Sequence, residues 1–260
     1  MSDTVLLDID AGIARVTLNR PDAANGIDLE MAAALLDVAH TVKADANVRA
    51  VLLTGAGPRF CGGGDVRSFT GAPDLPRFLR EVTTALHAAL AIFDKLDAPI
   101  VSAVQGSAAG AGVGLVAMSD LAIAAQSCKF VMAYTGIGLT PDGSTTWYLP
   151  RLVGLRLATE LTLTNRVLTA DEARQVGLVT RVVADETLLT EAEALATQLA
   201  AGPTKAFGAA KRLLRASSTT SLEAQMAAES EAIARAGASD DGIEGIAAFV
   251  AKRAPTFRGR

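Results

Sequence analysis

Short apolar runs that alternate with helix-forming segments are the feature of this 260-residue chain that most constrains its fold. Two strands, Thr4–Asp8 and Ile13–Leu18, are predicted on either side of Asp10–Gly12, a turn typical of a hairpin. Further strands are predicted at Val48–Thr54, Pro99–Val104 and Leu121–Ala125, and helices at Asp28–His40, Pro76–Leu96 and Ala111–Ser119. Strands separated by helices at this spacing predict βαβ units around a buried, mostly parallel sheet.

The second half of the chain has a different pattern, which is almost wholly helical from Trp147 onward. Helices are predicted at Thr145–Val153, Leu155–Leu163, Ala170–Val176, Glu186–Ala201, Lys205–Ala216 and Ser221–Ala236. No linker rich in Ser, Gly or Pro separates the two halves. We therefore expect a sheet-containing core followed by a helical C-terminal subdomain, packed on that core or on a neighbouring subunit.

Composition excludes several classes of protein. Half of the residues are hydrophobic and the net charge is −4, so the chain is neither disordered nor basic enough for nucleic acid. Glycines and Asp120 interrupt the longest apolar run, Ile100–Ala125, and Met1–Thr4 lacks the features of a signal peptide. Cys61 and Cys128 have no metal-binding spacing. We expect a cytoplasmic, metal-free protein with no nucleic-acid or membrane partner.

Two glycine-rich segments, Phe60–Asp65 and Gly106–Gly112, each follow a predicted buried strand. Neither has the GxGxxG pattern or the Lys-Ser/Thr pair of nucleotide-binding loops. Both expose backbone N–H groups, and the second segment opens a helix whose dipole favours negative charge. Two such loops at neighbouring strand ends would direct two N–H donors at one oxygen, forming an oxyanion hole. The alternative is that the glycines only allow tight turns and close packing.

Several segments, taken together and in order, resemble the crotonase, or enoyl-CoA hydratase/isomerase, superfamily. They are Leu18–Pro21, Arg49–Asp65, Pro99–Gly112, Ile137–Thr145, Leu149–Gly154, Glu172–Val183 and Phe249–Gly259. The resemblance implies an α/β fold: a crotonase-like spiral core of ββα units over residues 1–200, then a helical oligomerisation region over residues 201–260. It also implies a homotrimer, or a hexamer built as a dimer of trimers.

The resemblance further implies an acyl-CoA thioester substrate, with no cofactor beyond the coenzyme A that the substrate carries. The amides of Gly64 and Ala111 would hold the thioester oxygen and stabilise its enolate. Other residues that match the family's acyl-CoA contacts are Asp22, Ala23, Ala24, Asp65, Val66, Arg67 and Tyr134. In the tail, Phe249 and Lys252 match residues that reach the coenzyme A of a neighbouring subunit.

The acid–base residues are where the sequence departs from the hydratases. Gly114 and Tyr134 occupy the positions of the two water-orienting glutamates, so we expect the usual hydration reaction to fail. A different carboxylate, Asp142, stands in the turn Thr140–Ser144. This turn resembles the acid–base segment of the isomerase group that includes 1,2-epoxyphenylacetyl-CoA isomerase and enoyl-CoA isomerases. Asp142 is therefore predicted to move a proton between two carbons, in fatty-acid or aromatic-acid breakdown.

Three alternatives remain at this point. The chain could be a hydratase-type lyase, or a hydrolase like 4-chlorobenzoyl-CoA dehalogenase, with Asp142 as nucleophile and His87 as a second acid–base group. Tyr134 and Gly64 differ from the aromatic residues of that dehalogenase, and a lone histidine on a helix is more simply a packed or surface residue. The third alternative is a non-catalytic acyl-CoA-binding protein, which would be favoured if Asp142 faced bulk solvent.

Overall fold

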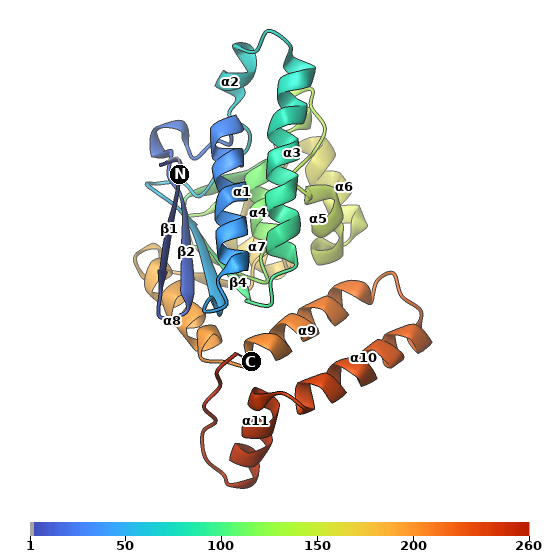
Figure 1. Cartoon of the computed structure of the whole chain (residues 1–260). Coiled ribbons are helices and arrows are strands. Elements are labelled where there is room, and N and C mark those ends of the chain that lie inside the picture. The colour runs from blue at the N-terminus through green and yellow to red at the C-terminus, as the bar shows by residue number, and fades with distance from the viewer. Residues whose placement is uncertain (1–2, 260) are drawn as a thin grey trace.

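The computed structural model describes residues 3–259, and its centre is a six-stranded sheet with the order β1-β2-β3-β4-β6-β9 (Figure 1). The strands are β1 Val5–Asp10, β2 Ile13–Leu18, β3 Ala50–Gly55, β4 Ile100–Val104, β6 Leu121–Ala125 and β9 Arg181–Val183. The β1–β2 hairpin is antiparallel, and all other neighbours are parallel. The predicted mostly parallel sheet is confirmed.

Helices surround this sheet, and α1 and α3 lie side by side along it (Figure 1). In the first part of the chain these are α1 Leu29–Ala44, α2 Val66–Thr70, α3 Leu75–Asp94, α4 Ala111–Met118, α5 Thr145–Val153 and α6 Leu155–Thr164. They are followed by α7 Ala170–Gln175, α8 Leu188–Ala200, α9 Thr204–Ala216, α10 Leu222–Gly237 and α11 Asp240–Val250. The carboxylate of Asp28 caps α1 by accepting the N–H of Met31, so α1 begins where the sequence predicts.

The prediction of an almost wholly helical second half is wrong in detail. Strand β8, Leu168–Thr169, joins β5, Ser107–Ala109, and β7, Lys129–Val131, in a second sheet of three strands, and β9 extends the main sheet. These strands have two or three residues each, which is too short for an alternating pattern to appear. They form because neighbouring strands supply backbone hydrogen-bond partners.

Both glycine-rich segments leave the sheet at the same edge. The first follows β3 and the second follows β4, and these strands are adjacent and parallel. Beyond the strands the two segments hydrogen-bond to each other: the amide of Cys61 donates to the Ser107 carbonyl at 3.2 Å, and the amide of Ala109 donates to the Cys61 carbonyl at 2.9 Å. The expected pairing of the two loops at neighbouring strand ends is confirmed.

The C-terminal helices α9, α10 and α11 project away from the rest of the chain (Figure 1). No residue of α10 is buried. Large apolar side chains are exposed along the three helices: Leu214, Leu222, Met226, Ile233, Ile243, Ile246, Phe249 and Val250. Ion pairs attach α9 to the core, since Lys211 and Arg215 both contact the Asp120 carboxylate. Between residues 3 and 259, no helix combines the length and the apolar character needed to cross a bilayer.

Asn25 connects the turn after β2 to the first glycine-rich loop. Its side chain is fully buried, and its Nδ2 donates to the carbonyls of Ala56, Arg59 and Phe60 at 2.9, 2.7 and 3.1 Å. Its Oδ1 accepts the amide of Arg20 at 2.8 Å. A single buried amide side chain therefore lies within hydrogen-bond distance of three carbonyls and fixes one loop against the other.

We predict that Asn25→Ala lowers the free energy of unfolding by about 2–4 kcal/mol, because a fully buried side chain is removed and the carbonyls of Ala56, Arg59 and Phe60 lose the donor that bonds them. Urea unfolding followed by circular dichroism measures the change. Asn47→Ala is the control, since Asn47 is exposed and its side chain bonds only to Asp45. Equal destabilisation by the two substitutions would contradict the assignment.

Candidate active site

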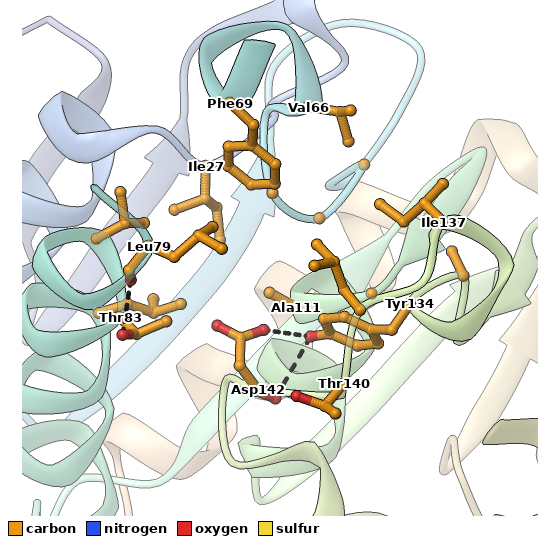
Figure 2. Close-up of a pocket in the computed structure, with 18 of the residues that line it drawn as sticks. Ile27, Val66, Phe69, Leu79, Thr83, Ala111, Tyr134, Ile137, Thr140 and Asp142 are labelled. Atoms are coloured by element: carbon orange, nitrogen blue, oxygen red, sulfur yellow. Dashed lines mark hydrogen bonds between the residues drawn. The ribbon is translucent and has the colours of Figure 1, made fainter. Parts of the chain in front are cut away.

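A largely apolar cavity of about 260 Å³ lies beside the two glycine-rich loops (Figure 2). Its apolar lining includes Ile27, Val66, Phe69, Leu79, Leu86 and Leu139, and its polar lining includes Arg80, Thr83, Tyr134, Thr140 and Asp142. Gly64 and Ala111 also line it. Apolar walls with a few convergent polar groups are typical of a small-molecule site.

The amide of Gly64 makes no hydrogen bond to any residue that the structure describes. Ile27 donates to the Gly63 carbonyl at 2.7 Å and accepts the Asp65 amide at 2.9 Å. In this parallel bridge, the N–H of the intervening Gly64 points away from Ile27. Within residues 3–259, the amides of Gly64 and Ala111 have no hydrogen-bond partner. The N-terminus of α4 also has no side-chain cap, so its dipole is open to a ligand.

Close backbone contact brings these two amides together. Gly63 has φ +88°, and a Cβ placed on it would lie 2.8 Å from the Ala109 carbonyl oxygen and 3.4 Å from the Gly110 Cα. Gly110 has φ +50°. Only glycine allows both the backbone conformation and this approach. Because Gly64 and Ala111 directly follow the contacting residues, both predicted donors lie at one end of the cavity.

The loop that carries Asp142 packs on the same helix start. Gly143 and Ser144 both have left-handed backbone conformations, with φ +58° and +61°. A Cβ on Gly143 would lie 3.3 Å from the Cβ of Ala111. A Cβ on Gly114 would lie only 2.4 Å from the Gly143 carbonyl oxygen. The loop therefore occupies the space beside position 114 and places the Asp142 side chain next to the Ala111 donor.

Tyr134 holds the Asp142 carboxylate directly. Its hydroxyl donates to Oδ1 of Asp142 at 2.6 Å (Figure 2). Burial raises the pKa of Tyr134 well above its usual range, and the adjacent Asp142 charge raises it further. Tyr134 lines the cavity, as expected for a substrate contact, but its bond to Asp142 was not predicted. No local pattern reveals that bond, since it depends on how two loops pack.

His87, on α3, lies on the other side of the same loop. Its side chain is half exposed, and its Nε2 accepts the amide of Gly143 at 3.1 Å. The same nitrogen is 3.9 Å from Oδ2 of Asp142, which is beyond hydrogen-bond distance. Nε2 of His87 is therefore occupied by the Gly143 amide and makes no hydrogen bond to Asp142.

A second cavity, of about 600 Å³, adjoins the first and shares Gly62, Gly64 and Val66 with it. It is lined by all the residues expected from the resemblance to contact coenzyme A in the first 70 residues: Asp22, Ala23, Ala24, Gly64, Asp65, Val66 and Arg67. The two remaining candidates lie elsewhere. Phe249 is 86% exposed at the end of α11, Lys252 follows it, and neither lines these cavities.

Cysteine and metal chemistry have no support at this site. Cys61 is fully buried, and burial raises the pKa of its thiol to about 12. A thiol in this state is a poor nucleophile. Among the residues that the structure describes, no cluster of His, Cys, Asp and Glu could hold a metal ion.

Comparison with known proteins gives full-length matches. A family model described as enoyl-CoA hydratase/isomerase matches residues 8–260. The chain is 40% identical to 1,2-epoxyphenylacetyl-CoA isomerase of Escherichia coli (strain K12), over all of both proteins. It is 33% identical to 4-chlorobenzoyl coenzyme A dehalogenase-2 of Arthrobacter sp, over 82% of this chain and 78% of that protein. The crystal structure of an enoyl-CoA hydratase from Polaromonas sp. JS666 superposes with a TM-score of 0.93 and 31% identity, over 98% of this chain and 99% of that one.

Both tyrosines of the chain are predicted to remain protonated at pH 10 to 11. The pKa of Tyr134 is raised by burial and by Asp142, and that of Tyr148 by burial and its hydrogen bond to Asp94. Because the folded pKa values exceed the unfolded value of about 10, their contribution to stability is complete below pH 10 and is lost above it. Absorbance at 295 nm should show no tyrosinate in the folded protein at pH 10 to 11.

Protein unfolded in guanidinium chloride is the control for this titration, and its two tyrosines should ionise near pH 10. A tyrosine that titrates near pH 10 while circular dichroism still reports the folded state would contradict the burial and bonding described above.

Proposed function

The chain belongs to the enoyl-CoA hydratase/isomerase family, and on this basis we propose that it moves a carbon–carbon double bond within an enoyl-CoA thioester. The predicted crotonase-like fold is confirmed by the structural match to that family. The finer assignment, isomerase rather than hydratase, rests on the acid–base groups. It is supported by one observation above all: the Asp142 loop packs against Ala111, so the lone carboxylate and the amide donors face one cavity.

The proposed reaction needs no water. Asp142 takes a proton from C2 of a 3-enoyl-CoA as the C2–H bond breaks, and the electron pair moves to the thioester oxygen. The amides of Gly64 and Ala111 stabilise that enolate oxygen, and one such donor contributes about 3–4 kcal/mol in a related kind of site. The enolate then collapses, Asp142 returns the proton to C4, and the double bond lies between C2 and C3. Atoms and electrons balance without a co-reactant.

Hydration is disfavoured at the two positions where the family's hydratases carry glutamates. Gly114 packs against the Gly143 carbonyl, which leaves no space for a longer side chain there. Tyr134 is protonated, and its hydroxyl is committed to Asp142. The remaining carboxylate near the donors is Asp142 itself, so a second group to orient and activate water is missing from the cavity lining.

The dehalogenase-like alternative is disfavoured by the hydrogen bond that Nε2 of His87 accepts from the Gly143 amide. A histidine that activates water needs a free ring nitrogen facing that water. Nε2 of His87, the nitrogen that faces Asp142, already accepts the Gly143 amide. The purely binding alternative is disfavoured by Asp142, whose side chain is about a quarter exposed and lines the cavity rather than facing bulk solvent.

We further propose that coenzyme A extends from the first cavity into the second, past Asp22–Ala24 and Asp65–Arg67. No separate cofactor is required, and a cytoplasmic location fits the proposed substrate. The exposed apolar faces of α10 and α11 favour a homotrimer or a hexamer, in which Phe249 and Lys252 reach a neighbouring subunit's coenzyme A.

Sedimentation velocity tests the assembly. We expect a species of three or six chains, each of 26.7 kDa, at micromolar concentration. Replacing Ile233 and Ile246 with glutamate should shift the distribution to smaller species, because both side chains are exposed and would carry charge into an apolar interface. A wild-type protein that sediments as a monomer would rule the assembly out.

Asp142→Asn tests the reaction. We expect turnover of 3-enoyl-CoA to 2-enoyl-CoA to fall by at least about 1,000-fold, because the amide cannot accept the C2 proton. Acyl-CoA affinity, measured by calorimetry, should change by less than about threefold. Asp37→Asn, on an exposed face of α1, is the matched control and should leave turnover unchanged.

The same preparations should be incubated with 2-enoyl-CoA and analysed by chromatography. No 3-hydroxyacyl-CoA should form. Formation of that product by the wild type, or turnover of 3-enoyl-CoA that persists in Asp142→Asn, would refute the proposed function.

A further inference from the structure

The two oxygens of the Asp142 carboxylate have different surroundings. Oδ1 accepts the Tyr134 hydroxyl at 2.6 Å. Oδ2 has no hydrogen-bond partner among the described residues, and Nε2 of His87 is 3.9 Å away from it. In Figure 2 the oxygen that is not bonded to Tyr134 points toward the side of the cavity where Thr83 of α3 lies. One oxygen is therefore committed and the other is open.

Tyr134 is itself rigidly placed. Its side chain is only 9% exposed, and its ring packs on Gly110, where a Cβ would lie 3.5 Å from the tyrosine Cζ. The preceding residue, Ala133, adopts φ +60°, a conformation that costs a non-glycine residue free energy. The amide of Tyr134 donates to the Met132 carbonyl at 2.8 Å. The backbone strain at Ala133 lies directly before Tyr134, and packing against Gly110 holds the Tyr134 phenol in one position.

The loop on the other side of the contact is also fixed. The amide of Thr145 donates to the Asp142 carbonyl at 3.1 Å, and the Thr145 hydroxyl donates to the same carbonyl. The Gly143 amide donates to His87. With the backbone of Asp142 held in this way, rotation of its carboxyl group is the main remaining freedom. The Tyr134 hydrogen bond is the interaction that opposes that rotation.

We propose that Tyr134 is a positioning residue that holds Oδ1 of Asp142 and leaves Oδ2 as the single oxygen that takes and returns the substrate proton. This inference rests on the proposed role of Asp142. In the forward step the Oδ2–H bond forms as the C2–H bond breaks, and in the return step Oδ2–H breaks as C4–H forms. Tyr134 keeps its own proton throughout and donates a hydrogen bond to the same carboxyl group.

Tyr134→Phe removes only the hydroxyl. We expect kcat to fall by about 10- to 100-fold, the effect of losing one hydrogen bond to a charged group, while KM and acyl-CoA affinity change by less than about threefold. The acidic limb of the pH–rate profile should move to higher pH, because removing the Tyr134 hydroxyl removes a hydrogen bond donated to the charged carboxylate. The other titratable or charged groups facing this carboxylate are His87 and, further along the cavity, Arg80.

Tyr148→Phe is the matched control. Tyr148 is the only other tyrosine, is also buried, and also donates its hydroxyl to an aspartate, Asp94, but it does not line the reaction cavity. This variant should keep the wild-type kcat and acidic limb, so a general effect of removing a buried phenol hydroxyl is separated from a specific effect on Asp142.

A second measurement covers the case in which Tyr134→Phe is unstable. In the Tyr148→Phe background Tyr134 is the only tyrosine, and 3-fluorotyrosine replaces it with little change of size. Its more acidic hydroxyl donates a stronger hydrogen bond, so the acidic limb should move to lower pH.

Wild-type kcat and an unmoved acidic limb in both tests would overturn the role of Tyr134. If Asp142→Asn is inactive in that case, the proposed function survives and only this inference fails. If Asp142→Asn remains active, the proposed function fails first.

Discussion

Backbone contact between the two glycine-rich loops is the constraint on which the rest of the site depends. Gly63 and Gly110 approach so closely that a single added methyl group on Gly63 would lie 2.8 Å from a carbonyl oxygen. Each of the two donors is the residue that follows, so the contact sets the separation of Gly64 and Ala111. Parallel pairing of β3 and β4 brings the loops to the same edge. The Cys61 amide, which donates to the Ser107 carbonyl, and the Ala109 amide, which donates to the Cys61 carbonyl, hold them there. The proposed oxyanion site, which is built from main-chain amides, would be preorganised by this packing rather than by any side chain.

The Asp142 loop packs on the start of α4, the helix that also supplies the Ala111 amide. Its left-handed residues Gly143 and Ser144 seat it in the space left by Gly114, and the contact with Ala111 follows from that fit. Strained or unusual backbone is thus concentrated where the carboxylate meets the amides, as is common at functional sites. The absence of a side chain at position 114 and the approach of the Asp142 loop are linked, because a Cβ on Gly114 would lie 2.4 Å from the Gly143 carbonyl oxygen. A glutamate at 114 would compete with the loop for the same volume.

How far the sequence could predict this structure depends on the range of the interactions involved. The main-sheet strands and the helix that follows Asp28 could be read from local patterns, because apolar periodicity and capping residues are close in the chain. The pairing of the two glycine-rich loops followed from the rule that parallel strands end at one edge. Strands β5, β7 and β8 could not be predicted, since each exists only through its partners. The family resemblance supplied the candidate residues but not their mutual contacts.

The hydrogen bonding around the Asp142 carboxylate could not be predicted from the sequence. Tyr134 and Asp142 are eight residues apart, and His87 is 55 residues before Asp142, yet all three meet at one loop. Asn25 is similar: an ordinary turn residue by sequence, its buried side chain donates to carbonyls about 30 residues further along the chain. Such polar contacts depend on side-chain direction within a completed fold, which periodicity does not encode. Family motifs name the residues but leave open which oxygen of Asp142 is free.

Asp142 is the one carboxylate in the lining of the cavity among the described residues, and the proposed reaction therefore requires that water be kept away from it. A reaction that moves one proton between two carbons with one carboxyl group loses its proton to solvent if water reaches Oδ2 between the two steps. The cavity lining is largely apolar, with Leu86 of α3 and Leu139 among its residues, and the Tyr134 hydroxyl bonds Oδ1. A two-carboxylate hydratase requires the opposite, because it must hold and polarise a water molecule. Replacing one glutamate position by glycine and the other by a buried tyrosine removes both water-binding charges, and the same tyrosine protects one side of the carboxylate that remains.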